Sequence, residues 1–183
     1  MLTQPRGKQA LLVIDVQNAI FQLPVPLHEP EQFLSKVRGL VERARRAGVP
    51  VIFAQHLGKH GSTLEAGSPG GEIHSAIAPL HGEVIVGKTE PDAFMGSTLA
   101  AQLAALTGTS ELVVCGFATQ DCVDTTVRNA FARGYSVVLA AGAHTTTANP
   151  VLSAAQIIAH HEFVLRRFAR VVPSDAIEFE SRR

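Results

Sequence analysis

The stretch LVVCGFATQDC, residues 112–122, decides the fold of this chain. Its first four residues form a continuous apolar run, which is typical of a parallel strand covered on both faces. A turn with one glycine follows, and apolar residues then recur at helical spacing over 123–131. The stretch therefore predicts a strand, a turn and a helix, with Cys122 at the start of that helix.

The order helix, glycine, strand recurs along the chain and predicts an α/β domain. A glycine after a helix supplies the left-handed residue that often ends it. The three units are 33–44 with Gly48 and 49–53, 99–106 with Gly108 and 112–115, and the helix ending at Arg133 with Gly134 and 135–139. Further apolar runs at 10–14, 84–86 and 171–172 bring the expected strands to six. We therefore expect one three-layer α/β domain over residues 1–183, with a mainly parallel sheet.

Two helix starts carry capping signals. Ser97 is expected to cap the second helix, and Asn149-Pro150 to provide the cap and first residue of the fourth.

A long irregular stretch, about 55–82, lies between the second and third expected strands and is rich in Gly, Ser and His. Loops of this length are commonly functional, so we expect it to face the substrate.

Composition restricts the function classes. The 183 residues include 16 basic and 16 acidic side chains, so the formal net charge is zero. A neutral chain gives no electrostatic case for binding nucleic acid or an anionic membrane. No apolar run approaches the roughly 20 residues that span a bilayer, and no signal peptide is recognised. We expect a cytoplasmic protein with a small-molecule substrate and with neither a nucleic-acid nor a membrane partner.

Three chemically complementary side chains follow predicted strands: Asp15 after the first, Lys88 after the third and Cys122 after the fourth. Ligands of open parallel sheets bind beyond the carboxyl ends of the strands. If the strand order is 3-2-1-4-5-6, the first and fourth strands are neighbours and the three side chains share one rim. Each has a plainer alternative, namely a turn-forming aspartate, a solvated lysine and an inert buried thiol. Together they favour an activated nucleophile.

The expected place of Cys122 in the first turn of a helix affects its ionisation. Unpaired backbone N–H groups and the positive end of the helix dipole lie there. Both favour the thiolate, the nucleophilic form, over a thiol whose ordinary pKa is about 8.5. The sequence thus predicts that Cys122 ionises more readily than a free thiol.

Several segments together resemble the isochorismatase-like cysteine hydrolases, and the resemblance covers most of the chain. They are ALLVIDVQN (10–18), GKT (87–89) with 92–94 and 98–99, GFATQDCV (116–123), and Ala130 with 134–137. The resemblance implies a Rossmann-like, six-stranded sheet of order 3-2-1-4-5-6 and an Asp15-Lys88-Cys122 triad that hydrolyses C–N bonds. It also implies a cis peptide bond at Phe117–Ala118.

These roles imply a mechanism for a small amide, ureido or carbamoyl substrate. Asp15 takes the thiol proton and returns it to the leaving nitrogen. Cys122 attacks the carbonyl carbon and forms an acyl-enzyme, while Lys88 offsets negative charge beside it. The backbone N–H groups of Ala118 and Cys122 form the expected oxyanion hole. Water then releases the acid.

Five residues near the expected rim are candidates for substrate binding: Gln17, Phe21, His56, Phe94 and Phe117. Core packing is the alternative for each phenylalanine, and a turn cap is the alternative for Gln17. Related proteins are often dimers or tetramers, so a homo-oligomer is expected.

The chain departs from the nicotinamidases of this superfamily, which carry an Asp-x-His metal motif after the second strand. The corresponding stretch here is AQHLG, residues 54–58, with His56 at the aspartate position. His56, His60 and His74 do not match a familiar zinc spacing. We therefore expect neither a catalytic metal nor another cofactor. True isochorismatases cleave a vinyl ether and often lack the cysteine, so vinyl ether hydrolysis is the alternative activity.

Two other function classes compete. GEVIVGKT, residues 82–89, satisfies the P-loop pattern and would make the protein a nucleotide binder. However, its central residues read as a strand rather than a loop, and the proline at 91 disfavours an immediate helix. A binding module with an inert cysteine is the third possibility, and the reactivity of Cys122 distinguishes it from an enzyme.

Overall fold

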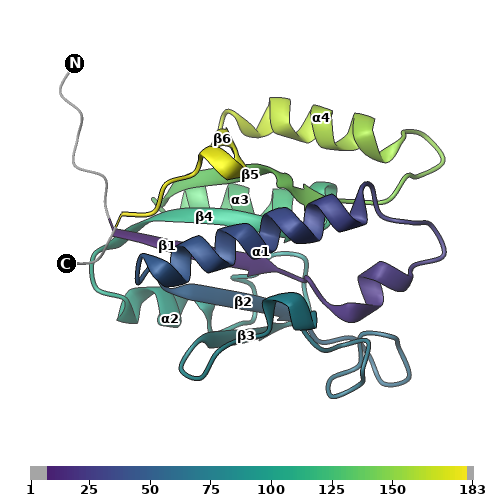
Figure 1. Cartoon of the computed structure of the whole chain (residues 1–183), viewed down its shortest axis with the longest axis horizontal. Coiled ribbons are helices and arrows are strands. Elements are labelled where there is room, and N and C mark those ends of the chain that lie inside the picture. Colours follow the sequence, from purple (N-terminus) through teal and green to yellow (C-terminus); the bar gives the residue numbers. More distant parts are fainter. Residues whose placement is uncertain (1–7, 181–183) are drawn as a thin grey trace.

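A computed structural model describes residues 8–180, and its centre is a six-stranded, all-parallel sheet (Figure 1). The strand order is β3-β2-β1-β4-β5-β6, which confirms the expected topology. The strands are β1 (Lys8–Ile14), β2 (Val51–His56), β3 (Val84–Lys88), β4 (Thr109–Phe117), β5 (Ser136–Thr145) and β6 (Arg170–Pro173). Strands β1 and β4 are neighbours at the centre, where the chain reverses direction across the sheet. This is the switch point at which open α/β sheets bind ligands.

Helices lie on both faces of the sheet and give three layers (Figure 1). Helix α1 packs on one face, α2 and α3 pack on the other, and α4 packs against α3 and β5. The helices are α1 (Pro30–Arg46), α2 (Leu99–Ala105), α3 (Asp124–Ala132) and α4 (Ala154–Leu165), with short turns η1 (Asn18–Gln22), η2 (Ser75–Ile77), η3 (Thr119–Val123) and η4 (Ser174–Ala176). None of the helices within 8–180 is long and apolar enough to cross a membrane.

The core has two halves, one on each face of the sheet. In β1, Leu11 and Val13 face the half under α1, whereas Leu12 and Ile14 face the half under α2 and α3. This alternation follows from the two-residue period of a strand. All four side chains are buried, which explains why β1 reads as a continuous apolar run.

The structure corrects both capping predictions. Helix α4 begins at Ala154, and Ser153 and Gln156 form a reciprocal capping box, whereas Asn149 caps the preceding turn. Thr98 occupies the N-cap position of α2, although the Ser97 hydroxyl does accept a hydrogen bond from the Leu99 N–H at 3.1 Å. The sequence signals therefore placed each helix start within a few residues of its observed position but did not identify the N-cap residue.

Gly116 is required by the close approach of β4 to β1. Its φ is +130°, and a Cβ atom there would lie 2.0 Å from the carbonyl oxygen of Ile14. Both the conformation and the contact exclude a side chain. The bare backbone at this point lets β4 lie against β1 directly below the turn that carries Cys122.

We expect Gly116→Ala to lower the free energy of unfolding by more than about 3 kcal/mol, or to prevent folding, because left-handed strain and a backbone clash add. Gly134→Ala is the matched control, since Gly134 also has a positive φ of +90° but has open space around it. Its expected loss is about 1–2 kcal/mol, from strain alone. Urea unfolding measures both, and equal losses would contradict the role given to the β1 contact.

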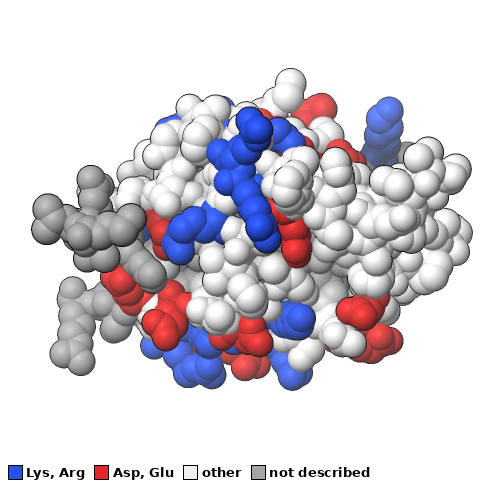
Figure 2. Space-filling model, turned by 90° about the horizontal axis from the view of Figure 1, so that it is seen from above, with Lys and Arg blue, Asp and Glu red and all other residues white. Residues whose placement is uncertain are grey.

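Charged side chains of both signs are interspersed on the face that carries α4, seen from above in Figure 2. This distribution agrees with the zero formal net charge of the chain.

Candidate active site

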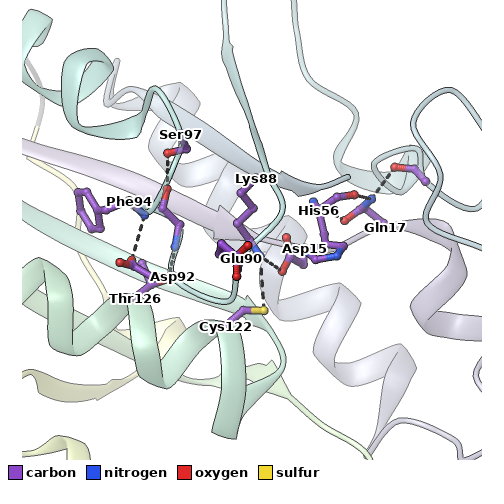
Figure 3. Close-up of polar contacts among 12 residues, drawn as sticks. Asp15, Gln17, His56, Lys88, Glu90, Asp92, Phe94, Ser97, Cys122 and Thr126 are labelled. Carbon is purple, nitrogen blue, oxygen red and sulfur yellow. Dashed lines mark hydrogen bonds and ion pairs between the residues drawn. The ribbon is translucent and has the colours of Figure 1, made fainter. Parts of the chain in front are cut away.

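Three strand ends bring Asp15, Lys88 and Cys122 together at the carboxyl edge of the sheet (Figure 3). Lys88 Nζ lies 2.7 Å from Asp15 Oδ2 and 3.4 Å from Cys122 Sγ. It also donates a hydrogen bond to the carbonyl oxygen of Glu90 at 3.1 Å. Lys88 ends β3, which is separated from β1 by β2, so its long side chain spans that distance. The three residues expected to share one rim therefore do so.

The Asp15–Lys88 pair is shielded from solvent. Their side chains are 5% and 0% exposed, and Cys122 is half-buried beside them. Asp15 Oδ1 is buried and has no hydrogen-bond partner among the described residues. A carboxylate has about four lone-pair sites, and here Lys88 occupies only one oxygen. The second oxygen is therefore available to accept a proton.

Burial controls the ionisation of both acids at this site. It raises the pKa of Asp15 above its usual value, against the opposing effect of Lys88. Burial, and then the negative charge of Asp15, raise the pKa of the Cys122 thiol to about 12. A carboxyl with a raised pKa is a stronger base than an ordinary aspartate. The resting site accordingly holds a thiol next to a base.

The expectation that Cys122 ionises readily is therefore wrong. It placed Cys122 in the first turn of an α-helix, but α3 begins only at Asp124. Cys122 lies instead in η3, a single π-helical turn. Desolvation and the neighbouring Asp15 carboxylate raise the pKa of Cys122 by more than the positive charge of Lys88 lowers it. A base, rather than a lowered pKa, is the activating group that this arrangement provides.

Alkylation measures this directly. We expect iodoacetamide to label Cys122 at neutral pH on the order of 10³-fold more slowly than a free thiol, because so little thiolate is present. Asp15→Asn removes a charge that raises the pKa of Cys122, so labelling should become faster in that variant. Rate against pH, followed by peptide mass spectrometry, gives both results. A wild-type titration near the free-thiol pKa of about 8.5 would contradict this account.

The backbone around the nucleophile turn has two unusual features. The Phe117–Ala118 peptide bond is cis, as the resemblance implies, and η3 closes with a hydrogen bond from the Val123 N–H to the Ala118 carbonyl at 3.1 Å. Asp15 has a left-handed φ of +52°, which is rare outside glycine. A left-handed conformation at a residue other than glycine, such as that of Asp15, is strained and is found most often at functional sites.

Gln17 is a structural clamp rather than a substrate-binding residue. Its side chain is completely buried and its amide is committed to backbone groups. It donates to the carbonyl oxygens of His56 and Gly71 at 3.0 and 2.6 Å, and it accepts from the His56 N–H at 2.9 Å. Gln17 thus joins the segment after β1 to the end of β2 and to the long loop 57–74. The sequence prediction that it contacts substrate is not supported.

Phe94 is also misplaced by the sequence prediction. Its ring is 5% exposed and points away from Cys122 (Figure 3). It stacks on Tyr135 with a centroid separation of 6.3 Å, and the Arg133 guanidinium lies 4.7 Å from its centroid. Both partners lie between the end of α3 and the start of β5. Phe94 belongs to the core, which was the alternative for each phenylalanine.

The remaining three candidates lie on the expected side of the sheet. His56 ends β2 beside Asp15 and is one of the groups that lower the pKa of that carboxyl (Figure 3). Phe117 ends β4 and is partly buried. Phe21 is also partly exposed and packs on His74 and Phe33. Contact of these three residues with substrate stays a prediction.

The histidines of the long loop do not form one cluster. His60 is exposed and bonds to Glu65, whereas His74 caps η2 and packs on Phe21. No group of three or more His, Cys, Asp or Glu residues within 8–180 is arranged to hold a metal ion. The P-loop alternative is wrong, because Val84–Lys88 is strand β3 and Lys88 is buried against Asp15.

Sequence reasoning missed a buried network that holds the segment after Lys88 on α3. The Asp92 carboxylate accepts hydrogen bonds from the Phe94 N–H and from the Asn129 amide, and the Thr126 hydroxyl accepts from the Ala93 N–H. Polar residues at 126 and 129, three apart on the inner side of a helix, were the available signal. His144 on β5 was also missed, and it contacts Thr119 in the nucleophile turn.

Comparisons with known proteins show the family and support the fold. Residues 9–175 match the Isochorismatase domain family. The chain is 41% identical over 138 residues to a streptothricin hydrolase of Streptomyces noursei, covering 75% of this chain but only 50% of that protein. It is 29% identical to an N-carbamoylsarcosine amidase of Arthrobacter sp over 73% of this chain and 58% of that protein. The crystal structure of an isochorismatase from Pseudomonas putida KT2440 superposes with a TM-score of 0.88 at 32% identity, covering 96% of this chain and 94% of that one.

Proposed function

Because the chain belongs to the Isochorismatase domain family, we propose that it is a cysteine hydrolase that cleaves a C–N bond through an acyl-enzyme on Cys122. The observation that supports this best is the position of Lys88 Nζ, 2.7 Å from Asp15 and 3.4 Å from Cys122. A nucleophile, a base with a free oxygen and a cation in one partly buried site are the parts that covalent catalysis needs.

The first half of the proposed reaction acylates the enzyme. Asp15 Oδ1 accepts the proton of the Cys122 thiol, and the sulfur attacks the carbonyl carbon of the substrate. The tetrahedral intermediate collapses when the Asp15 carboxylic acid gives this proton to the leaving nitrogen. Ammonia or an amine departs and a thioester remains. The raised pKa of Asp15 suits both steps, since the group must bind and release a proton.

The second half restores the enzyme. Asp15 takes a proton from water while the water oxygen attacks the thioester carbonyl. The acid product leaves and the Cys122 sulfur recovers its proton from Asp15. The Lys88 ammonium stabilises whichever of its two neighbours carries negative charge. Backbone N–H groups of Ala118 and Cys122 are the proposed donors to the oxyanion in both halves.

The names of two relatives favour an amide, ureido or carbamoyl substrate over a vinyl ether. One is an N-carbamoylsarcosine amidase and another is a ureidoacrylate amidohydrolase. The base-assisted thiol also suits acyl transfer, because a thioester intermediate requires a carbonyl carbon. Vinyl ether cleavage would not need Cys122.

A substrate panel tests the proposal. Primary amides, N-carbamoyl amino acids and ureido acids are incubated with the protein, and ammonia release is measured beside a Cys122→Ala control. Release that depends on Cys122 from at least one class supports the proposal. Turnover of an enol ether by both proteins, with no ammonia release from the panel, would overturn it.

A further inference from the structure

A buried polar chain lies behind the nucleophile turn. The Thr119 hydroxyl is 2.9 Å from His144 Nδ1, and the two residues are 0% and 2% exposed. On the other side of the ring, His144 Nε2 lies 3.3 Å from Glu162 Oε1 on α4. That contact is close but poorly aligned, and Nε2 has no hydrogen-bond partner among the described residues. Within residues 8–180, Thr119 is therefore the one hydrogen-bond partner of the His144 ring.

An irregularity in β5 brings His144 to this position. Val114 pairs with Leu139, but Gly116 pairs with His144, so two steps along β4 correspond to five along β5. The three extra residues of β5 form a bulge that includes Gly142, whose φ is +76°. Bulges redirect side chains and are frequent beside active sites. This one places His144 directly beside the last residues of β4, from which the nucleophile turn starts.

Thr119 is well placed to transmit the position of His144 to Cys122. It is the first residue of η3, three positions before Cys122, and its carbonyl accepts the Asp124 N–H at the start of α3. Its side chain is anchored to β5 and its backbone is anchored to α3. Displacement of Thr119 would therefore shift the whole turn and the sulfur that it carries.

Burying an imidazole and a hydroxyl is unfavourable unless they bond to each other. The charged groups near His144 come from several elements. Glu162 faces it from α4, while His28, Glu29 and Lys36, before and within α1, line a cavity that His144 borders. An apolar pair would fill the same volume without the polar desolvation. The presence of a specific buried hydrogen bond behind the nucleophile indicates a positioning role.

We propose that His144 is a positioning residue, which holds the nucleophile turn and Cys122 in the geometry for attack through the hydroxyl of Thr119. This inference rests on the proposed function of Cys122. Glu162 limits the orientation of the imidazole ring from the opposite side. Neither His144 nor Thr119 exchanges a proton with substrate.

The test compares variants that keep or remove each hydrogen-bonding group. Thr119→Val and His144→Phe remove one partner each, whereas Thr119→Ser and His144→Asn keep a polar group. Because small misplacement of reacting groups lowers rates steeply, we expect the first two to lower kcat at least ~10-fold with little change in KM. The combined Thr119→Val, His144→Phe variant should be no worse than either alone. The conservative variants should stay within about 3-fold of wild type, since proximity is largely kept.

Iodoacetamide labelling gives a second readout that needs no substrate. A loosened turn exposes Cys122 and moves it from Asp15, so Thr119→Val and His144→Phe should be labelled several-fold faster at Cys122. Cys115, completely buried in β4, should stay unlabelled and so report an intact core. His161→Phe is the control, because the His161 ring bonds to the backbone of its own helix α4.

The two readouts separate failure of this inference from failure of the proposed function. Wild-type kcat and labelling rates in both Thr119→Val and His144→Phe, with only a lower Tm, would overturn the positioning role. If no substrate is turned over by wild type, the proposed function fails, and labelling at Cys122 alone decides the positioning role. Labelling of Cys115 together with Cys122 would show general loss of structure and would count against it.

Discussion

Cys122→Ala is expected to lower turnover of any amide substrate on the order of 10⁴-fold or more, because loss of the nucleophile removes the acyl-enzyme route entirely. The free energy of unfolding should change by less than about 1 kcal/mol, since Cys122 is half-buried and little apolar volume is lost. The measurement is kcat/KM by ammonia release, together with urea unfolding of both proteins.

Cys115→Ala is the matched control for this prediction. Cys115 is completely buried in β4, and burial raises the pKa of its thiol far above that of an ordinary cysteine. It packs in the core on the α1 side, so its replacement should reduce stability modestly and leave kcat near wild type. Comparable activity in Cys122→Ala and wild type would exclude nucleophilic catalysis by this residue.

Lys88→Met is expected to lower both stability and activity. Methionine fills most of the same volume but leaves the Asp15 carboxylate buried without a positive partner. Removing one member of a buried ion pair typically costs about 3–5 kcal/mol. Lys88 also lowers the pKa of Asp15, so its loss raises that pKa further and takes away ionised base at neutral pH. We expect kcat/KM to fall by roughly 10²-fold or more.

The stability loss in Lys88→Met should depend on pH in a defined direction. Burial raises the pKa of Asp15 in the folded protein above its unfolded value, and loss of Lys88 raises it further. The folded variant therefore binds this proton more tightly than wild type does, and it loses more stability when the proton leaves. Stability therefore falls as pH rises from the unfolded pKa of about 3.9 through the folded value. Urea unfolding should show a small deficit at about pH 4 and a larger one at about pH 8.

A double variant provides the control. Asp15→Asn combined with Lys88→Met removes both buried charges and should be more stable at neutral pH than either single variant. If the double variant shows the sum of the two single losses, the side chains do not interact as a buried pair. That result would also remove the support that Lys88 gives to the proposed mechanism.

The α/β class and the place of three residues at strand ends followed from sequence pattern, whereas the strand order was assumed and was also implied by the family resemblance. Alternating strands and helices fixed the side of the sheet on which Asp15, Lys88 and Cys122 lie, because parallel strands share one carboxyl edge. The bond at Phe117–Ala118 was predicted only through family resemblance. Neither apolar periodicity nor spacing carries information on that bond.

The direction of side chains in irregular segments could not be predicted from the sequence pattern. Gln17 and Phe94 follow strands in the chain, as expected of pocket residues, yet one bonds to backbone and the other packs under Arg133. Periodicity tells which face a residue occupies in a helix or strand, but it says nothing about a loop. Polar side chains in buried loops form hydrogen bonds with backbone groups that have no other partner. The sequence does not show which backbone groups these are.

His144 was missed because β5 was predicted to end at Leu139, whereas it extends to Thr145. The apolar run stops at Gly142, and the bulge then continues the strand past the point where the pattern ends. The ionisation of Cys122 was predicted in the wrong direction for a related reason. A helix start is visible in sequence, but burial and the proximity of Asp15 are properties of the folded chain.

The resting site therefore holds a protonated thiol that depends on Asp15 for activation. In this arrangement the sulfur is protected from adventitious electrophiles in water, since little thiolate exists until a base removes the proton. In the proposed mechanism it becomes a nucleophile when a carbonyl group is in place and Asp15 takes the proton. The proposed mechanism thereby ties the reactivity of Cys122 to occupation of the site.

Trapping the acyl-enzyme tests the central claim most directly. The protein is mixed with a substrate that releases ammonia, quenched in acid during steady-state turnover, and examined by intact-mass and peptide mass spectrometry. We predict an added mass equal to the acyl part of the substrate, located on the peptide at Cys122 and absent from Cys122→Ala. Sustained ammonia release by Cys122→Ala, or an adduct located at Cys115, would contradict the account.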